Sequence, residues 1–169
     1  AGIAELQNAM KQDAVKLDPR AMKHIVWILA HGLRSDALPE LFAILESGTV
    51  ADREMQIQIV RALADLADPV LVDHRLDSGV SDVNLGARFT RTLRELDEPH
   101  RLEIVIALAR MRWSKAPIWL DSDSWLVELD APFLHGLQQM LRRSGNWPDV
   151  LNLVSRRSAP SALKKKVRD

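Results

Sequence analysis

The sequence contains no cysteine, and this absence removes several kinds of chemistry at once. Disulfide bonds, thiolate catalysis and cysteine-ligated zinc are excluded, and a chain without disulfides suits a cytoplasmic location. Neither sign of charge is in excess, because 23 Lys plus Arg stand against 23 Asp plus Glu. No global field therefore draws the chain to nucleic acid or to an anionic membrane, and any such attraction has to be local.

Long apolar runs and strand patterns are also missing. No stretch approaches the roughly 20 residues that a membrane-spanning helix needs, so no membrane association is expected. The sequence shows no sustained alternation of β-branched or aromatic residues and no Asn-Gly or Asp-Gly hairpin turn. Strands are therefore not expected. With 169 residues, of which 47% are hydrophobic, the chain has the size and composition of one domain with its own core.

The familiar motifs of catalysis and metal binding are absent as well. There is no glycine-rich phosphate loop, no Gly-x-Ser-x-Gly elbow and no His-Glu-x-x-His. Asp121 and Asp123 offer oxygen ligands, but the further carboxylates and the central glycine of a calcium loop are missing. We expect no metal site, no cofactor and no catalytic residue. Five histidines without metal-ligand spacing are interpreted as surface or boundary residues: His24, His31, His74, His100 and His135.

Proline marks the chain at places where helices should begin. Most of the eight prolines follow Asp, Ser, Asn or Glu within a few residues. Proline at the first helical position gives up only an amide that has no partner, whereas inside a helix or a central strand it costs a hydrogen bond. The pattern predicts about nine helices and an all-α fold. The predicted starts are marked by Pro19, Pro39, Pro69, Pro99, Pro117, Pro132, Pro148 and Pro160.

The stretch from Thr49 to Gly79 has the clearest helical pattern and predicts two short helices folded back on each other. Thr49 and Asp52 are expected to cap the first helix. Asp68-Pro69 closes it and begins the second, which Gly79 ends. A pair this small cannot bury its own faces, so it needs neighbours of the same kind. The predicted buried face of the first helix comprises Met55, Ile59, Ala62, Leu63 and Leu66.

Similar pairs recur along the rest of the chain. The starts at Pro19 and Asp52 lie 33 residues apart, and a third pair begins at Ser81. Spacings of about 30 to 50 residues between like elements are typical of helical repeats. Ser35 or Asp36 is expected to cap one partner helix. Other predicted helices lie at 3–17, at 19–33 with Ile28 widening the buried face, at 99–111, and at 131–143 paired with 147–156.

The run Val60-Arg-Ala-Leu-Ala-Asp-Leu-Ala-Asp-Pro69, followed by a short amphipathic helix, resembles the HEAT repeat. In that pattern an Arg and small residues on the first helix precede an Asp-Pro turn. Asp18-Pro19 and Glu98-Pro99 repeat only the turn. The resemblance implies a right-handed α-α superhelix of about four helical hairpins, forming a single helical-repeat domain over 1–169. HEAT arrays mostly bind other macromolecules, so the resemblance implies a scaffold and transfers no site residue.

Residues 113–130 break the repeat spacing and are predicted to form an irregular insertion. They hold three of the five tryptophans and carry a local net charge of minus three. Because Trp is enriched in binding hot spots, one interpretation is a recognition loop. The other is a connection whose indoles fill the gap between two helix pairs. The candidate partner-binding residues are Trp113, Trp119, Trp125, Asp121 and Asp123.

Positive charge gathers at the end of the chain, where residues 131–169 hold eight Lys or Arg and two acids. A basic edge could track phosphates, and Trp147 beside it could stack on a base. The alternative is a set of helix C-termini whose dipoles these side chains complement, followed by a solvated basic tail at 157–169. The candidates for nucleic-acid or anion binding are Arg142, Arg143, Trp147, Arg156 and Arg157.

Two enzyme classes remain by analogy with HEAT-like proteins. DNA alkylation repair glycosylases use Trp and Asp on a concave basic face, and lyases acting on tetrapyrroles would require a pocket. The favoured prediction is a non-catalytic cytoplasmic scaffold or adaptor that binds another protein, and the alternative is a nucleic-acid-binding helical repeat. The loose candidates for a repair-like site are Trp27, Trp113, Asp65 and Asp121.

Overall fold

A computed structural model gives the fold for most of the chain. Besides Glu5 and Asn8, it describes residues 18–47, 50, 52–74, 76, 83–93, 98–122, 130–156 and 160–168. These ranges contain helices, turns and short connections and no strand, so the all-α prediction is confirmed for them. The predicted helix at 3–17, apart from Glu5 and Asn8, lies outside the described residues, as do the predicted cap at Thr49 and the predicted helix end at Gly79.

The chain forms two compact units, residues 1–66 and 67–169. The boundary falls at the end of a helix and not in a linker, so the single domain over 1–169 stays a prediction. The first unit contains α2 (Pro19–Leu33), the 3-10 helix η1 (Arg34–Ala37), α3 (Leu38–Glu46) and nearly all of α4 (Arg53–Ala67).

The helices of the first unit begin where the sequence indicates. The Asp18 carboxylate accepts a hydrogen bond from the Arg20 amide at 2.7 Å and caps α2. The Asp52 carboxylate accepts one from the Met55 amide at 3.0 Å at the start of α4. Such caps satisfy amides that have no partner within the helix. The core of this unit contains Met22, Ile25, Val26, Leu29, Leu41, Phe42, Met55, Ile59, Val60 and Leu63.

Two details of the first unit differ from the predictions. Neither Ser35 nor Asp36 caps α3, because residues 34–37 form the 3-10 helix and Ala37 occupies the cap position without a side-chain hydrogen bond. Ile28 does not widen the buried face of α2 but is 50% exposed. The neighbouring helix α4 approaches a different side of α2, where Lys23 pairs with Glu54 at 2.5 Å and Trp27 donates to Gln58 at 3.4 Å.

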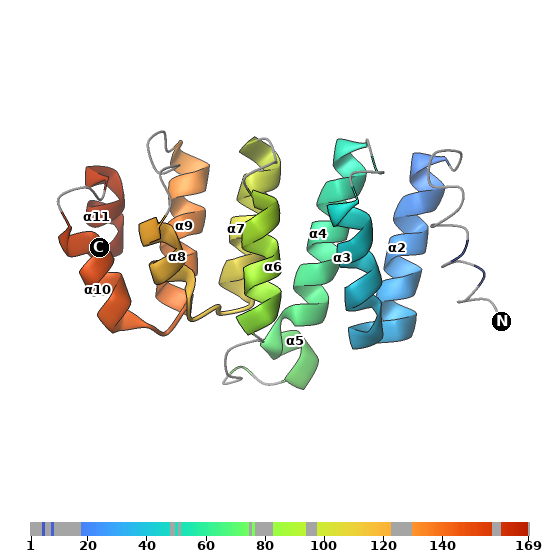
Figure 1. The fold of residues 1–169 in the computed structure, drawn as a ribbon, viewed down its shortest axis with the longest axis horizontal. Coiled ribbons are helices and arrows are strands. Elements are labelled where there is room, and N and C mark those ends of the chain that lie inside the picture. The colour runs from blue at the N-terminus through green and yellow to red at the C-terminus, as the bar shows by residue number, and fades with distance from the viewer. Residues whose placement is uncertain are drawn as a thin grey trace. The chain divides into compact units, whose positions relative to one another are not determined.

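The second unit is built from successive helix pairs. Helix α6 contacts α7, α8 contacts α9, and α10 contacts α11, while α7, α9 and α11 form one row and α8 and α10 another (Figure 1). The helices after the short α5 (Pro69–Asp73) are α6 (Val83–Leu93), α7 (Glu98–Arg110), α8 (Ala116–Ser122), α9 (Ala131–Arg143), α10 (Trp147–Ser155) and α11 (Ser161–Arg168).

Helices α7 and α9 run in the same direction and pack closely. The side-chain amide of Asn146, just after α9, donates to the backbone carbonyl of Ser114, just after α7, at 2.9 Å. Both helices therefore end at the same side of the unit. A Cβ at Gly136 would lie 3.2 Å from Val105 Cγ1 and 3.3 Å from Leu102 Cδ1. The absence of a side chain at Gly136 therefore lets the backbone of α9 approach α7.

Three predictions about the second unit need correction. The interval 113–130 is not wholly irregular, because it contains α8. The interval 157–169 is not simply a tail, because Ser161–Arg168 form α11 and Leu163 is fully buried. Helix α10 makes its main contacts with α8 and α11, and α9 is not its hairpin partner. Both helices nevertheless begin beside prolines that were predicted to mark helix starts, Pro117 and Pro160.

The proline pattern is confirmed as a marker of helix starts. One proline lies at the first or second position of each of the helices α2, α3, α5, α9 and α10. Helices α7 and α8 also have a proline near their starts. Pro160 directly precedes α11. The caps also follow the sequence: the carboxylate of Asp68 accepts from the Val70 amide at 3.0 Å, and that of Asp130 accepts from the Phe133 amide at 2.8 Å.

Candidate functional site

Trp113 lies in the core of the second unit and does not present a surface to a partner. Its side chain is only 4% exposed, and it rests on the backbone of α6 at Gly86, where an added Cβ would overlap the indole ring. The indole Nε1 is buried, and among the described residues it has no hydrogen-bond partner. For Trp113, the structure therefore favours the packing interpretation over the recognition loop.

Trp119 occupies a different position, because it is only partly covered. It lies on α8, and its ring centroid is 6.2 Å from that of Trp113 with the planes tilted by 55°. Tilted aromatic pairs at this separation are favourable and fix the orientation of both rings. The next residue back, Ile118, is 47% exposed. The buried Trp113 thus supports a helix that carries exposed apolar side chains.

The structure does not describe the side chains of the remaining residues of the predicted Trp and acidic cluster. Trp125 and Asp123 lie outside the described residues. Asp121 belongs to the last turn of α8, and the structure describes the backbone of this residue but not its side chain. Whether these three residues join Trp119 in a binding surface stays a prediction.

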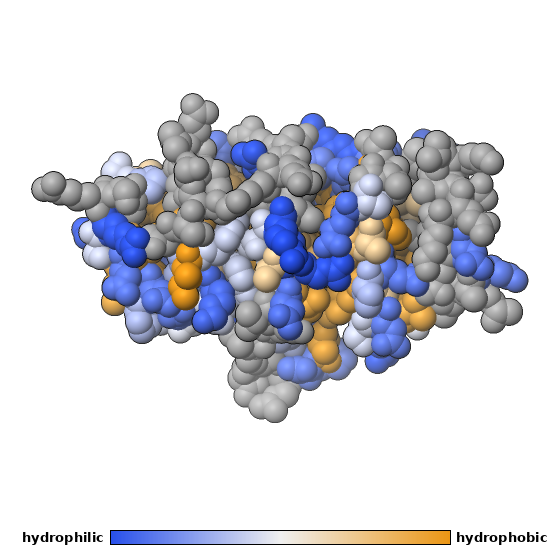
Figure 2. All heavy atoms as spheres, in the orientation of Figure 1, coloured by the Kyte–Doolittle hydropathy of each residue, from blue (hydrophilic) through white to orange (hydrophobic). Residues whose placement is uncertain are grey.

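Helices α8 and α10 contact each other, and each of them exposes an apolar side chain. The bond from Asn146 Nδ2 to the Ser114 carbonyl aligns their N-terminal ends, and Asn146 also donates to Asp149 at 2.8 Å. Ile118 and Leu151 each lie about one turn into their helices, and they are 47% and 61% exposed. Figure 2 shows hydrophobic atoms projecting over α8. We call Ile118, Trp119 and Leu151 the α8–α10 apolar face.

The basic candidates are divided between the two ends of α10. Arg142 and Arg143 are exposed in the last turn of α9, and Trp147, which is 46% exposed, begins α10 a few residues later. Arg156 follows the last turn of α10 at the opposite end of that helix and makes an interaction of its own. Arg157 lies outside the described residues. The structure brings three of the five candidates together.

The exposed cations of α11 were not among the predicted site residues, although they lie at the same end of the unit. The carbonyl of Lys166 accepts a hydrogen bond at 2.5 Å from Gln138, which lies one turn before Arg142. The last turn of α11 therefore lies beside the last turns of α9. A signal was present, because Leu163 and Val167 are spaced as one apolar helix face behind Pro160.

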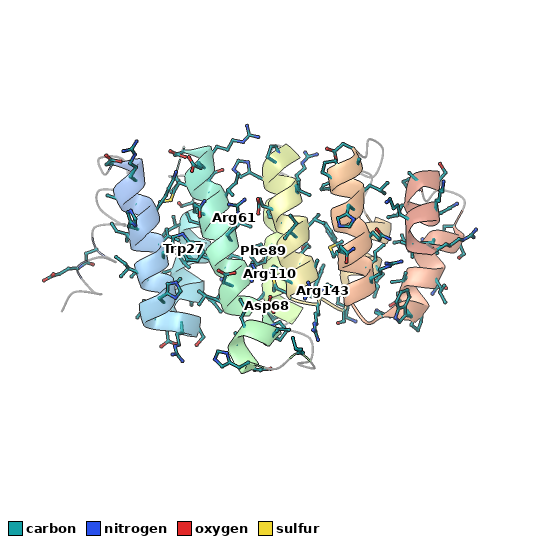
Figure 3. The ribbon with its side chains drawn as sticks, turned by 180° about the vertical axis from the view of Figure 1, so that it is seen from behind. Trp27, Arg61, Asp68, Phe89, Arg110 and Arg143 are labelled. Carbon is teal, nitrogen blue, oxygen red and sulfur yellow. The ribbon has the colours of Figure 1, made fainter. Side chains whose placement is uncertain are left out.

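An ion pair that the sequence does not indicate joins α5 to α7. Asp68 Oδ2 lies 3.1 Å from Arg110 Nε, while Oδ1 of the same carboxylate caps α5 (Figure 3). The side chains are only 9% and 26% exposed, so water screens the pair weakly. Asp68 is therefore a structural residue that connects successive elements and is not a candidate acid or base.

The residues considered as candidates for a site like that of the DNA repair glycosylases belong to different units. Trp27 and Asp65 belong to the first unit, and Trp113 and Asp121 belong to the second. Within the described ranges, no three His, Asp or Glu residues are placed to hold a metal ion. Likewise, no described helix combines the length and apolarity needed to cross a membrane.

Comparisons with known proteins add no family assignment. Neither the protein-family models, the curated proteins nor the solved structures gave a match to the chain. The fold defines the class for the described residues, an all-α protein of paired helices.

Proposed function

We propose that this chain is a non-catalytic protein-binding scaffold or adaptor, built as a HEAT-like right-handed α-α superhelix of about four hairpins. The successive pairs α6–α7, α8–α9 and α10–α11 support this proposal, since each pair contacts the next. In such arrays each helix pair buries its apolar faces against the neighbouring pairs, and one side of the array remains free to bind a partner. A chain without cysteine suits action in the cytoplasm.

The observation that carries the proposal is the α8–α10 apolar face. Ile118 and Leu151 expose about half or more of their surface on two adjacent helices. Covering the exposed part of each would contribute about 1 kcal/mol, and a Trp beside them is the residue type most enriched in binding hot spots. An apolar centre of this kind fits a partner protein, with surrounding polar residues giving orientation.

The test is capture of partners by the full chain from lysate of the source organism, with and without nuclease treatment. The variant Ile118→Ser with Leu151→Ser is compared with the matched control Leu71→Ser with Val72→Ser, which alters two exposed apolar residues of α5. We expect the first variant to lose at least tenfold of the specific captured protein and the control to retain it.

Circular dichroism before capture distinguishes a lost surface from a lost fold. All four substituted side chains are at least 47% exposed, so helix content and melting temperature should change little. Equal loss of capture by both variants would contradict the proposed face. Disappearance of every captured protein after nuclease treatment would contradict the scaffold function itself.

A further inference from the structure

The last turns of two neighbouring helices of the second unit carry five exposed cations. Arg142 and Arg143 end α9, and Lys165, Lys166 and Arg168 lie in the last turn of α11. We call these five residues the basic edge. Within the described part of the chain, none of their side chains takes part in an ion pair. All five side chains are exposed.

The arrangement follows from the packing of α11 on α9. Leu163 is fully buried, and the Gln138 side chain donates to the Lys166 carbonyl. Because Gln138 precedes Arg142 by one turn, the ends of both helices lie on the same side. Packed helices have axes about 8–10 Å apart, and a single strand carries one phosphate per roughly 3.4 Å of duplex axis. The edge thus spans two or three successive phosphates.

Compensation of helix dipoles accounts for only a small part of this charge. Each helix C-terminus carries roughly half a negative charge, so two of them balance about one cation and leave about four in excess. Two described acids, at the starts of α9 and α10, are engaged elsewhere. Asp130 caps the opposite end of α9, and Asp149 accepts from Asn146. The remaining charge is available to an anionic ligand.

An exposed aromatic side chain lies next to the basic edge. Trp147 is 46% exposed at the first position of α10 and follows Arg143 by four residues. Since consecutive Cα atoms are 3.8 Å apart, the two residues are separated by at most about 15 Å. An indole beside a row of cations offers a stacking surface as well as charge, and stacking distinguishes a nucleobase from an acidic peptide.

We propose that the basic edge and Trp147 form a binding site for single-stranded nucleic acid. The five cations hold successive phosphates, and the indole stacks on one base without reading its sequence. This site is separate from the α8–α10 apolar face, so it adds a second ligand to the proposed scaffold. Each function can fail while the other holds.

The first experiment measures fluorescence anisotropy of labelled oligo-dT and oligo-U with the full chain over a salt series. The variant Arg142→Gln with Arg143→Gln is compared with the matched control Arg20→Gln with Arg91→Gln, which removes the same charge from exposed sites in α2 and α6. Two or three phosphate contacts predict a log–log salt slope of about −1.4 to −2.1, and the edge variant should reduce its magnitude by up to about 1.4.

We expect the edge variant to bind at least tenfold more weakly at low salt, with the control unchanged. Comparing oligo-dT with oligo-U shows whether DNA or RNA is preferred, and either result fits the site. Equal weakening by the control would overturn the proposal, because net charge alone would then account for binding. Absence of binding by the natural chain at low salt would also overturn it.

A second pair of variants tests stacking. Trp147→Ala should weaken binding by about 5- to 100-fold, and Trp147→Phe should retain most of the affinity. Circular dichroism confirms that both variants keep their helix content. If poly-glutamate of the same charge or duplex DNA competes as well as the single strand, the site is not one for single-stranded nucleic acid.

Discussion

The indole of Trp113 packs directly on the backbone of Gly86, and this contact sets the role of both residues. At an ordinary helical position, Gly to Ala stabilises by about 1 kcal/mol. Here a methyl group would overlap a ring that is itself enclosed, with only 4% of its surface exposed. Overpacking of this kind costs about 1–3 kcal/mol, so the steric term should exceed the gain in helix propensity.

Gly86→Ala is therefore expected to lower the free energy of unfolding by about 1–2 kcal/mol, measured by urea denaturation. Gly136→Ala serves as the control, because its nearest neighbours are side-chain carbons of Val105 and Leu102 that can shift by a few tenths of an ångström. That substitution should cost less. Adding Trp113→Leu to Gly86→Ala should remove part of the penalty caused by Gly86→Ala, and a fully additive pair would contradict the direct contact.

At this scale the sequence predicts which residue types are apolar but not which of them are covered. Ile28 was predicted to be buried and is exposed, whereas Trp113 was considered for a surface and is buried. Ile28 extends an apolar helix face yet is 50% exposed, whereas Trp113 belongs to a Trp-rich stretch that suggested a surface yet is buried. Helical periodicity defines a face, but the neighbour that covers it comes from elsewhere in the chain.

Asp68 shows how one carboxylate connects two elements. Its Oδ1 satisfies the first amides of α5, and its Oδ2 holds Arg110 at the end of α7. The Asp-Pro dipeptide predicts the cap, because local spacing determines that interaction. The partner lies 42 residues away, and no local pattern in the sequence indicates it.

Substitutions at Asp68 can separate these two roles. Asp68→Asn keeps an oxygen that can cap α5 but removes the charge, and we expect it to lower the free energy of unfolding by about 1–3 kcal/mol. Asp68→Ala should cost about 1 kcal/mol more because the cap is also lost. A double-mutant cycle with Arg110→Met, followed by urea denaturation, should give a coupling of about 1 kcal/mol or more. Additive effects would show that the ion pair contributes nothing.

Helix bounds were predictable where strong signals agree. The predicted helices at 131–143 and 147–156 match α9 (Ala131–Arg143) and α10 (Trp147–Ser155) closely, since a proline lies at the second position of each and Asp130 also caps α9. Pro117 marked the start of α8, but the interval 113–130 was interpreted as irregular because seven residues hold too few turns for a periodic pattern. In α11, a run of lysines obscured the apolar spacing that buries Leu163.

For the molecule as a whole, the all-α class followed from the sequence, whereas the pairing of helices did not. Local signals define each element, but partners depend on which surfaces fit in three dimensions. In the candidate surfaces, too, some neighbours follow from the sequence and others only from the packing of helices. Arg142, Arg143 and Trp147 are close because they are close in sequence, while the cations of α11 join them through the packing of α11 on α9.

Both proposed surfaces depend on the stacking of successive helix pairs, represented by the contact of α7 with α9. A Cβ at Gly136 would lie 4.0 Å from the Cβ of Val105, a separation suited to a disulfide. Because the natural chain has no cysteine, introduced pairs can be studied without interference. The closed loop of about 30 residues should stabilise the protein by about 3–4 kcal/mol if no strain is introduced.

The most direct test is therefore thiol titration after oxidation of the variant Val105→Cys with Gly136→Cys, compared with Ile106→Cys with Gly136→Cys. Ile106 neighbours Val105 in sequence but is 39% exposed on another side of α7. We predict loss of both free thiols in the first variant, reversible by reduction, and retention in the second. Free thiols in both variants, or equal cross-linking in both, would contradict the stacking of α7 on α9.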